Sequence, residues 1–284
     1  MADHPVIAGF DVQPDHPGVS DPAYRSRRAV IAAAGEAWRP GDPMPVVDYT
    51  PEEDELWSTV SAALAAKHQH LACGEYRRGI AALGLPRDRV PQLGDVSARL
   101  GTLARFRLQP VPGLVPTRHF YGALADRTFL STQYIRHHSV PFYTPEPDIV
   151  HEIVGHAGLL ASPVFADLHQ RAGLASQRAT TAAALELFSR VFWFSLEFGV
   201  VHEHGELRAY GAGLLSSYGE IDVFRNAEVR ALDIAAMATT PYDISKYQPL
   251  LFAAESIDHA VDALGSFFDA YDDDTVARLE RLPG

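Results

Sequence analysis

Cysteine is almost absent from the sequence: Cys73 is the single one among 284 residues. A disulfide framework within the chain is therefore excluded, and a reducing compartment is expected. The first residues lack a basic start followed by an apolar stretch, so we expect no signal peptide. No apolar run approaches the roughly 20 residues needed to cross a bilayer. Together these absences predict a soluble, cytoplasmic protein with no membrane partner.

Basic residues are scarce as well, with 24 Lys and Arg against 36 Asp and Glu and a formal net charge of −12. This excess of negative charge disfavours nucleic acid and anionic membrane surfaces as partners. Apolar residues make up 47% of the chain and prolines number 20, which indicates a folded core and excludes a coiled coil or wholesale disorder. We find no internal repeat, phosphate-binding glycine loop or low-complexity tract.

Helix signals are spread over the chain, whereas strand signals are few. Thr50 and Pro51, followed by Glu53, form a capping-box pattern, and Ser162 with Pro163 predicts a second helix start. Further helices are expected at 24–38, 75–83, 96–102, 117–124, 181–199, 232–237 and 257–268, and short strands at 106–111 and 127–136. A loop or tight turn is expected at 208–216. The expected fold is mainly α with a few short β strands (α+β), divided into an N-terminal arm (1–45), one main domain (46–268) and a C-terminal tail (269–284).

The segment 143–160 carries the most informative polar residues. Its prolines and Asp148 precede an apolar helical pattern, so a helix is expected to begin near Asp148. His151, Glu152 and His156 lie on that helix among Ile and Val residues. Two imidazoles and a carboxylate in an apolar setting suggest a metal site. The alternative is structural, with one buried histidine and one cation at a helix end.

The spacing of the two histidines is unusual for a metal site on a helix. Zinc proteases place them four residues apart, whereas His151 and His156 are five apart. On a regular helix five steps leave the side chains about 140° apart. One ion can bind both only if the helix ends or distorts between them, which Gly155 favours. An octahedral site therefore fits better than a protease zinc site.

A third ligand candidate is Glu197, which lies within the apolar helix expected at 181–199. An isolated buried carboxylate costs several kcal/mol unless it is paired, protonated or bound to a metal. Glu197 could instead lie on a solvated edge or pair with Arg190 or Lys246. With the two histidines, however, it completes the two-His, one-carboxylate set of non-haem Fe(II) sites.

Several segments, in the same order, resemble the pterin-dependent aromatic amino acid hydroxylases. The resemblance covers about residues 45–268, which it implies are the catalytic domain. It is carried by residues 111–114 (VPGL), 132–136 (TQYIR), 143–152 (YTPEPDIVHE), 155–156 (GH), 193–199 (WFSLEFG), 208–217 (RAYGAGLLSS), 248–250 (QPL) and 254–256 (AES).

The resemblance implies a role for each matching position. It implies an Fe(II) site made by His151, His156 and Glu197, and a catalytic acid beside the pterin at Glu152. It implies that the substrate amino acid is bound by Arg136, Tyr143, Thr144, Pro147, Asp148, Trp193, Phe198, Gly213 and Ser216. It implies that a tetrahydropterin is held by Leu114, Val115, Thr117, Phe120 and Phe192, with Phe120 stacking on its ring. Dioxygen is the further reactant, and the short chain resembles monomeric bacterial members.

The sequence departs from the family at several positions. Ala157 and Gly158 stand where Val-Pro is usual, which is expected to loosen the chain and enlarge the nearby space. Pro116 and Thr117 replace two Ser of many members, Phe192 replaces a common Tyr, and Leu130 replaces the His of animal enzymes. These changes bear on the pterin contacts and on the ring position attacked, more than on the iron.

The leading hypothesis is a monooxygenase that converts L-phenylalanine to L-tyrosine. Phenylalanine 3-hydroxylation and tryptophan 5-hydroxylation remain open within the class. A zinc hydrolase with Glu152 as base is the alternative from another class, and a non-catalytic amino acid-binding protein is a third. Other polar groups are expected to be structural: His137 and His138 as a surface pair, His202 and His204 in a solvated turn, and 272–274 as a helix start.

Overall fold

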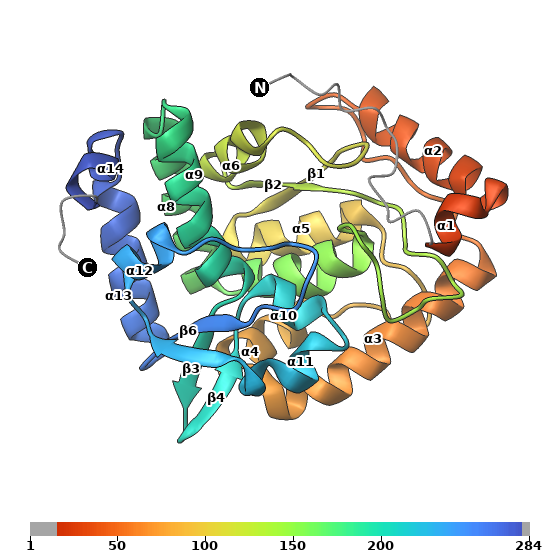
Figure 1. Ribbon diagram of the computed structural model, residues 1–284. Coiled ribbons are helices and arrows are strands. Elements are labelled where there is room, and N and C mark those ends of the chain that lie inside the picture. Colours follow the sequence, from red (N-terminus) through yellow and green to blue (C-terminus); the bar gives the residue numbers. More distant parts are fainter. Residues whose placement is uncertain (1–15, 280–284) are drawn as a thin grey trace.

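Helices dominate the part of the chain that the computed structural model describes, residues 16–279 (Figure 1). The α-helices that precede residues 151–157 are α1 (Pro17–Ser20), α2 (Pro22–Ala37), α3 (Pro51–Leu71), α4 (Gly74–Leu83), α5 (Leu93–Ala104) and α6 (Thr117–Ala125). Those that follow them are α7 (Gly158–Leu160), α8 (Pro163–Arg178), α9 (Ala182–Phe192), α10 (Ala212–Ser216), α11 (Glu220–Val223), α12 (Ile234–Thr239), α13 (Ile257–Ala270) and α14 (Asp274–Leu279). Three short helices are not α-helical: the π-helices η1 (His151–Ala157) and η2 (Trp193–Glu197), and the 3-10 helix η3 (Phe224–Asn226).

The strands are short and form two small sheets. In the first, β1 (Arg107–Pro110) pairs in parallel with β2 (Thr128–Ser131). The second has the order β4 (Glu206–Ala209), β3 (Val200–Glu203), β6 (Leu250–Ala254), β5 (Glu228–Ala231), with only the β3–β4 pair antiparallel. The expected mainly α fold with a few short strands is confirmed. No helix within residues 16–279 is both long enough and apolar enough to cross a bilayer.

One large hydrophobic core joins α3 to α13 and includes residues of the segment 143–160. Trp57, Phe165 and Phe188 are among its fully buried side chains. A small second cluster, in which Ile31 of α2 contacts Val47 and Tyr134, attaches the N-terminal helices. Ion pairs reinforce this attachment, with Arg27 on Glu53 and Arg28 on Glu146. The described part of the predicted arm, residues 16–45, is thus packed against Tyr134 and Glu146, which precede His151 in the chain.

Local signals located the long helices well. The capping box at Thr50 is present, since its hydroxyl accepts from the Glu53 amide while the Glu53 carboxylate accepts from the Thr50 amide. The helix start predicted at Ser162 and Pro163 is confirmed, since Ser162 is the N-cap of α8; its hydroxyl makes no capping bond but donates to Glu75 (2.5 Å). Asp272 and Asp273 lie at helix starts as expected: Asp272 accepts from the Thr275 amide before α14, and Asp273 accepts from the Thr181 amide before α9.

Three expectations about regular structure need correction. The helix expected at 181–199 is α-helical only to Phe192, where the wider turn of η2 begins. The segment 208–216 is not a loop, because it contains the end of β4 and the short helix α10. Strands β3, β5 and β6 were not predicted; β5 is exposed at all four positions, so it lacks the alternating pattern that marks a strand.

Candidate metal centre and active site

The five-residue spacing of the histidines is accommodated by η1, a π-helix. Bonding from residue i to residue i+5 widens the turn, so that side chains five apart come to lie on nearly the same face. The Gly158 amide closes this turn by donating to the Ile153 carbonyl. The expected distortion between His151 and His156 is confirmed, and it takes the form of a widened turn instead of a helix end.

Gly155, in the middle of η1, lets this turn pack directly on α10. A Cβ atom at Gly155 would lie 2.7 Å from the Ala212 carbonyl oxygen, closer than side-chain carbons approach backbone. The close approach matters because α10 also carries Ser216, which contacts a ligand histidine (below). Glycine is therefore required here by packing rather than by backbone angle.

We predict that Gly155→Ala separates η1 from α10. Overpacking of a well-filled core costs about 1–3 kcal/mol, and the shift would also misalign the metal-binding side chains. Chemical denaturation should show that loss, and calorimetry should show weakened binding of divalent metal. Gly122→Ala is the matched control, because nothing lies within 4 Å of a Cβ at that helical glycine. Equal stability and metal affinity for the two variants would contradict the packing argument.

The third candidate ligand also lies on a π-helix. In η2 the Phe198 amide donates to the Trp193 carbonyl, five residues earlier, at 2.8 Å. Glu197 is the last residue of this widened turn, and 13% of its side chain is exposed. Widened turns of this kind occur frequently at functional sites, and here two of them deliver all three donors.

The three donor side chains converge. His156 Nε2 lies 3.1 Å from His151 Nε2 and 2.9 Å from Glu197 Oε1, and all three donor atoms lie within 4.8 Å of one another. Donors that bind one ion at about 2.1 Å and at right angles are about 3.0 Å apart, so the two short distances fit neighbouring ligands of one octahedral metal ion. The three side chains therefore form a group that could hold a metal ion.

Ser216 sets the tautomer of His151. Its hydroxyl donates to the Ala212 carbonyl (2.9 Å), so it accepts the hydrogen bond that His151 Nδ1 makes to it (2.8 Å). With the proton on Nδ1, the lone pair of Nε2 faces the other donors, as a metal ligand requires. This contact differs from the substrate contact that the resemblance implies for Ser216.

The charges at the site suit a cation. Burial lowers the pKa of His151 to about 4, which keeps its imidazole neutral. Burial acts to raise the pKa of Glu197, but neighbouring His156 outweighs it, so the pKa lies below its ordinary value and the group is anionic. Neither alternative partner pairs with Glu197, since Arg190 pairs with Glu186 and Lys246 with Asp243.

Glu152, expected as a catalytic acid, is buried beside this centre. Its Oε1 accepts from the backbone amide and the hydroxyl of Thr132, both at 3.2 Å. Burial raises the pKa of Glu152 to about 7, against the opposing effects of His156 and of the Thr132 hydrogen bonds. A carboxyl group with such a pKa can hold or release a proton near neutral pH.

Arg136 and Asp148 form a fully buried, bidentate ion pair. Arg136 Nε and Nη2 lie 2.9 and 2.8 Å from the two carboxylate oxygens. Asp148 also accepts from the backbone amides of Arg136 and His151. Burial acts to raise the pKa of Asp148, but the guanidinium lowers it below its ordinary value. The pair thus links the expected carboxylate-binding arginine to the first turn of the metal helix.

An aromatic wall lies on the Glu197 side. The Trp193 and Phe198 rings are 4.5 Å apart, and a Cβ at Gly213 would meet the Phe198 ring at 2.6 Å. Tyr143 lies about half exposed. Thr144 is partly buried and donates to the Glu146 carbonyl, and Pro147 is also partly buried.

Two residues that fix Trp193 were not predicted. Tyr242 stacks on the indole (4.4 Å between centroids, 13° between planes), and the side-chain oxygen of Gln248 accepts from the indole N–H at 2.9 Å. The backbone N–H of Gln248 in turn donates to the buried carboxylate of Glu220 (2.6 Å). The QPL motif pointed to Gln248, but nothing in the sequence places Tyr242 against the indole.

Glu220 gives a pH prediction. Burial raises its pKa to about 7, opposed by the bond from Gln248, so its ionised form is disfavoured in the folded state. The resulting penalty is small at low pH, grows as pH rises from about 4.3 to 7, and persists above that. We expect Glu220→Gln, which keeps an acceptor for Gln248, to gain roughly 2 kcal/mol over wild type between pH 5 and pH 8. Urea unfolding across this range should show curves that diverge; parallel curves would contradict the buried carboxyl.

Two of the expected pterin residues, Phe120 and Phe192, connect to His156 through Phe129. Phe129 of β2 packs on the His156 ring (4.5 Å) and on Phe120 (5.4 Å), which also contacts Phe192 (6.3 Å). The other expected pterin residues are less buried: Val115 is partly buried, while Thr117 and Leu114 are exposed.

Two expectations around the site are wrong. The Ala157–Gly158 pair leaves no extra space, because a Cβ at Gly158 would lie 2.6 Å from the Tyr76 ring. His137 is not a surface residue; it is 4% exposed and contacts Asp21, whereas His138 is exposed as expected. His204 is exposed in the β3–β4 turn, as expected, whereas His202 is exposed but lies on β3, paired with Leu207 of β4.

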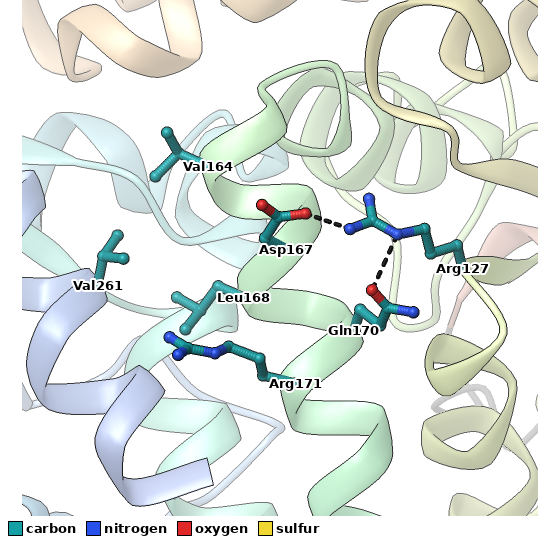
Figure 2. A pocket seen from close by; sticks show the side chains of 7 residues that line it. All are labelled: Arg127, Val164, Asp167, Leu168, Gln170, Arg171 and Val261. Atoms are coloured by element: carbon teal, nitrogen blue, oxygen red, sulfur yellow. Dashed lines mark hydrogen bonds and ion pairs between the residues drawn. The ribbon is translucent and has the colours of Figure 1, made fainter. Parts of the chain in front are cut away.

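A cleft of about 570 Å³ lies between α8 and α13, and it contains none of the candidate site residues. Figure 2 shows the Arg127 side chain bonded to Asp167 and Gln170 of α8, while Val261 lies across the cleft on α13. Val164, Asp167 and Arg171 form this outward face of α8. The cleft and the metal centre are therefore different places in the fold.

The chain matches known proteins along most of its length. The profile of the family described as biopterin-dependent aromatic amino acid hydroxylase matches residues 2–279. Phenylalanine 3-hydroxylase of Streptomyces coeruleorubidus is 50% identical over 94% of this chain and 96% of its own. Phenylalanine-4-hydroxylase of Rattus norvegicus is 42% identical over 91% of this chain, which spans only 58% of that relative. The structure of Chromobacterium violaceum phenylalanine hydroxylase with bound Fe(III) has a TM-score of 0.79 at 27% identity, covering 90% and 92% of the two chains.

A mainly helical fold with two histidines and one carboxylate at a single point defines an enzyme of the non-haem metal class. The comparisons specify it further: the chain belongs to the biopterin-dependent aromatic amino acid hydroxylase family. The predicted family, fold class and monooxygenase activity on aromatic amino acids are confirmed. A pterin cofactor follows from the family.

Proposed function

We propose that this hydroxylase acts on the ring of L-phenylalanine, with iron held by His151, His156 and Glu197. One observation carries the proposal: a buried guanidinium, an aromatic wall and the three-donor centre are joined by direct contacts. Asp148 joins Arg136 to the His151 amide, and Phe198 joins Trp193 to α10, where Ser216 contacts the His151 ring. When bound, ferrous iron and tetrahydropterin supply dioxygen activation and the electrons for the reaction.

The residues of the chain bind and orient the reactants. The planar Arg136 guanidinium, fixed by Asp148, binds the amino acid carboxylate through its remaining donors. Trp193, held by Tyr242 and Gln248, provides an apolar surface for the substrate ring. Glu152 holds a proton beside the centre, and the partly buried ring of Phe120, which packs on the fully buried Phe192, offers a face for pterin stacking.

Ring carbon 3 is the position we propose for hydroxylation, giving meta-tyrosine. The 50% identity to a phenylalanine 3-hydroxylase extends over almost the full length of both chains, which supports position 3. The sequence favoured position 4, and the 42% identity to the rat 4-hydroxylase keeps para-tyrosine as the second candidate. We also propose a cytoplasmic enzyme, supported by the single, buried Cys73, and a monomeric one, as the resemblance to short bacterial members implies.

Product analysis tests this proposal. Fe(II)-loaded protein, tetrahydropterin and oxygen are incubated separately with phenylalanine, tyrosine and tryptophan, and the products are separated by chromatography. We expect meta-tyrosine from phenylalanine as the main product. Para-tyrosine would refute the ring position, and turnover of only tyrosine or tryptophan would refute the substrate.

A zinc-loaded sample is the control for the hydrolase alternative. It should form no hydroxylated product, because zinc cannot change oxidation state. Phenylalanine binding by calorimetry without product in the iron sample would favour the non-catalytic binding protein.

A further inference from the structure

The Nδ1 atom of His156 has no hydrogen-bond partner among the residues that the structure describes. Its Nε2 faces His151 and Glu197, and Nδ1 points away from this donor cluster; when Nε2 binds a metal, Nδ1 carries the proton. Among the residues that the structure describes, no group lies within hydrogen-bond distance of this buried Nδ1. Metal-binding histidines almost always donate this second N–H to an acceptor, and an unmet buried donor costs about 1–3 kcal/mol.

A second orphaned nitrogen lies in the same region. His169 of α8 is fully buried, and its Nδ1 lies 2.7 Å from the Phe165 carbonyl oxygen. A carbonyl only accepts, so Nδ1 carries the proton and Nε2 has a free lone pair. This buried Nε2 also has no partner within the described residues.

The two rings are neighbours. Their centroids are 6.3 Å apart and their planes nearly perpendicular, at 83°. The cluster thus contains one unmet donor, His156 Nδ1–H, and one unmet acceptor, His169 Nε2. Phe165 and His169 are buried while Val164, Asp167 and Arg171 line the cleft on the other face of α8 (Figure 2), so helix packing fixes which way His169 points.

We propose that His169 is a positioning residue for the metal: its Nε2 accepts the Nδ1–H of His156, with at most one water between them. The bond orients the His156 ring, fixes the proton on Nδ1 and makes Nε2 a better ligand. His169 thereby does for His156 what the Ser216 hydroxyl does for His151. The inference rests on the proposed assignment of His156 as a metal ligand.

Two substitutions separate this role from simple packing. The amide of Asn reaches about as far as the Nδ1 of a histidine, so His169→Asn keeps a donor for the Phe165 carbonyl and loses the Nε2 acceptor. The longer side chain in His169→Gln places an amide oxygen near the Nε2 position and loses the donor to Phe165. If His169 acts only through its bond to the Phe165 carbonyl, Asn should preserve metal binding better than Gln. If His169 positions His156, Gln should preserve metal binding better than Asn.

The readout is Co(II) titration of the metal-free protein, followed by visible absorption and calorimetry, with no turnover required. We expect His169→Asn to lower Co(II) affinity about 10- to 100-fold and to shift the absorption bands, with His169→Gln close to wild type. Ser176→Ala is the matched control. Ser176 is buried on the same helix, and its hydroxyl donates to the Gly173 carbonyl within that helix. This variant should bind Co(II) as wild type does.

His156→Ala serves as the reference that separates the two levels of the argument. If it loses Co(II) binding while His169→Asn retains wild-type affinity and spectrum, the positioning role is overturned and the ligand assignment stands. If His156→Ala binds Co(II) like wild type, the metal centre itself is wrongly assigned, and the inference falls with it. Thermal melts of the metal-free variants confirm that each is folded when it is titrated.

Discussion

Replacement of Glu197 by Gln is expected to lower Fe(II) affinity by more than about 100-fold, since loss of a group that merely orients a metal ligand already costs 10- to 100-fold. Hydroxylation should disappear with the metal. The substitution keeps the size of the side chain but removes the anionic donor that lies 2.9 Å from His156 Nε2. Calorimetric titration of the metal-free protein with Fe(II) under anaerobic conditions measures the affinity directly.

Glu203→Gln is the matched control for this experiment. Glu203 follows on β3, and both of its carboxylate oxygens accept from the Gly74 amide instead of facing the metal cluster. It should bind iron and turn over as wild type does. Retention of iron and activity by Glu197→Gln would show that the carboxylate is not a ligand.

Loss of Arg136 is expected to have the second large effect. Arg136→Leu leaves Asp148 buried without its partner, and breaking such a pair costs about 3–5 kcal/mol of folding free energy. The substrate carboxylate loses its charge-assisted hydrogen bonds as well, which corresponds to a KM for phenylalanine raised at least about 100-fold. Urea unfolding and steady-state kinetics measure the two losses separately.

The control for Arg136 is Arg127→Leu. Arg127 pairs with Asp167 at the outer face of α8, away from the metal centre, and its side chain is more exposed (22% against 2%). This variant should lose less stability and keep the wild-type KM. Arg136→Lys should fall between wild type and Leu, because it keeps the charge but not the planar fork. An unchanged KM in Arg136→Leu would remove Arg136 from the substrate site.

Residue types, their spacing and the family resemblance were enough to select the three side chains that converge, but not to show how they meet. The i+5 spacing of His151 and His156 showed that a regular helix could not serve. The widened turns depend on tertiary contacts, such as the approach of Gly155 to Ala212, that periodicity does not contain. Composition therefore gave the ligand types, and packing gave their geometry.

Local signals also failed where contacts between distant segments decide the structure. The capping box at Thr50 was visible because all its atoms lie within four residues. The contact between His156 and His169 depends instead on how α8 packs against η1. Tyr242 likewise meets Trp193 only because the chain before β6 returns past η2. Gly158 was misjudged for the same reason, since the Tyr76 ring that fills its space comes from α4.

The position of iron in crystals of the Fe(II)-loaded protein, located by anomalous scattering at the iron absorption edge, tests the central claim most directly. We expect one strong peak about 2.1 Å from His151 Nε2, His156 Nε2 and the Glu197 carboxylate. A peak at any other site, or a peak that lacks one of these three contacts, would contradict the account.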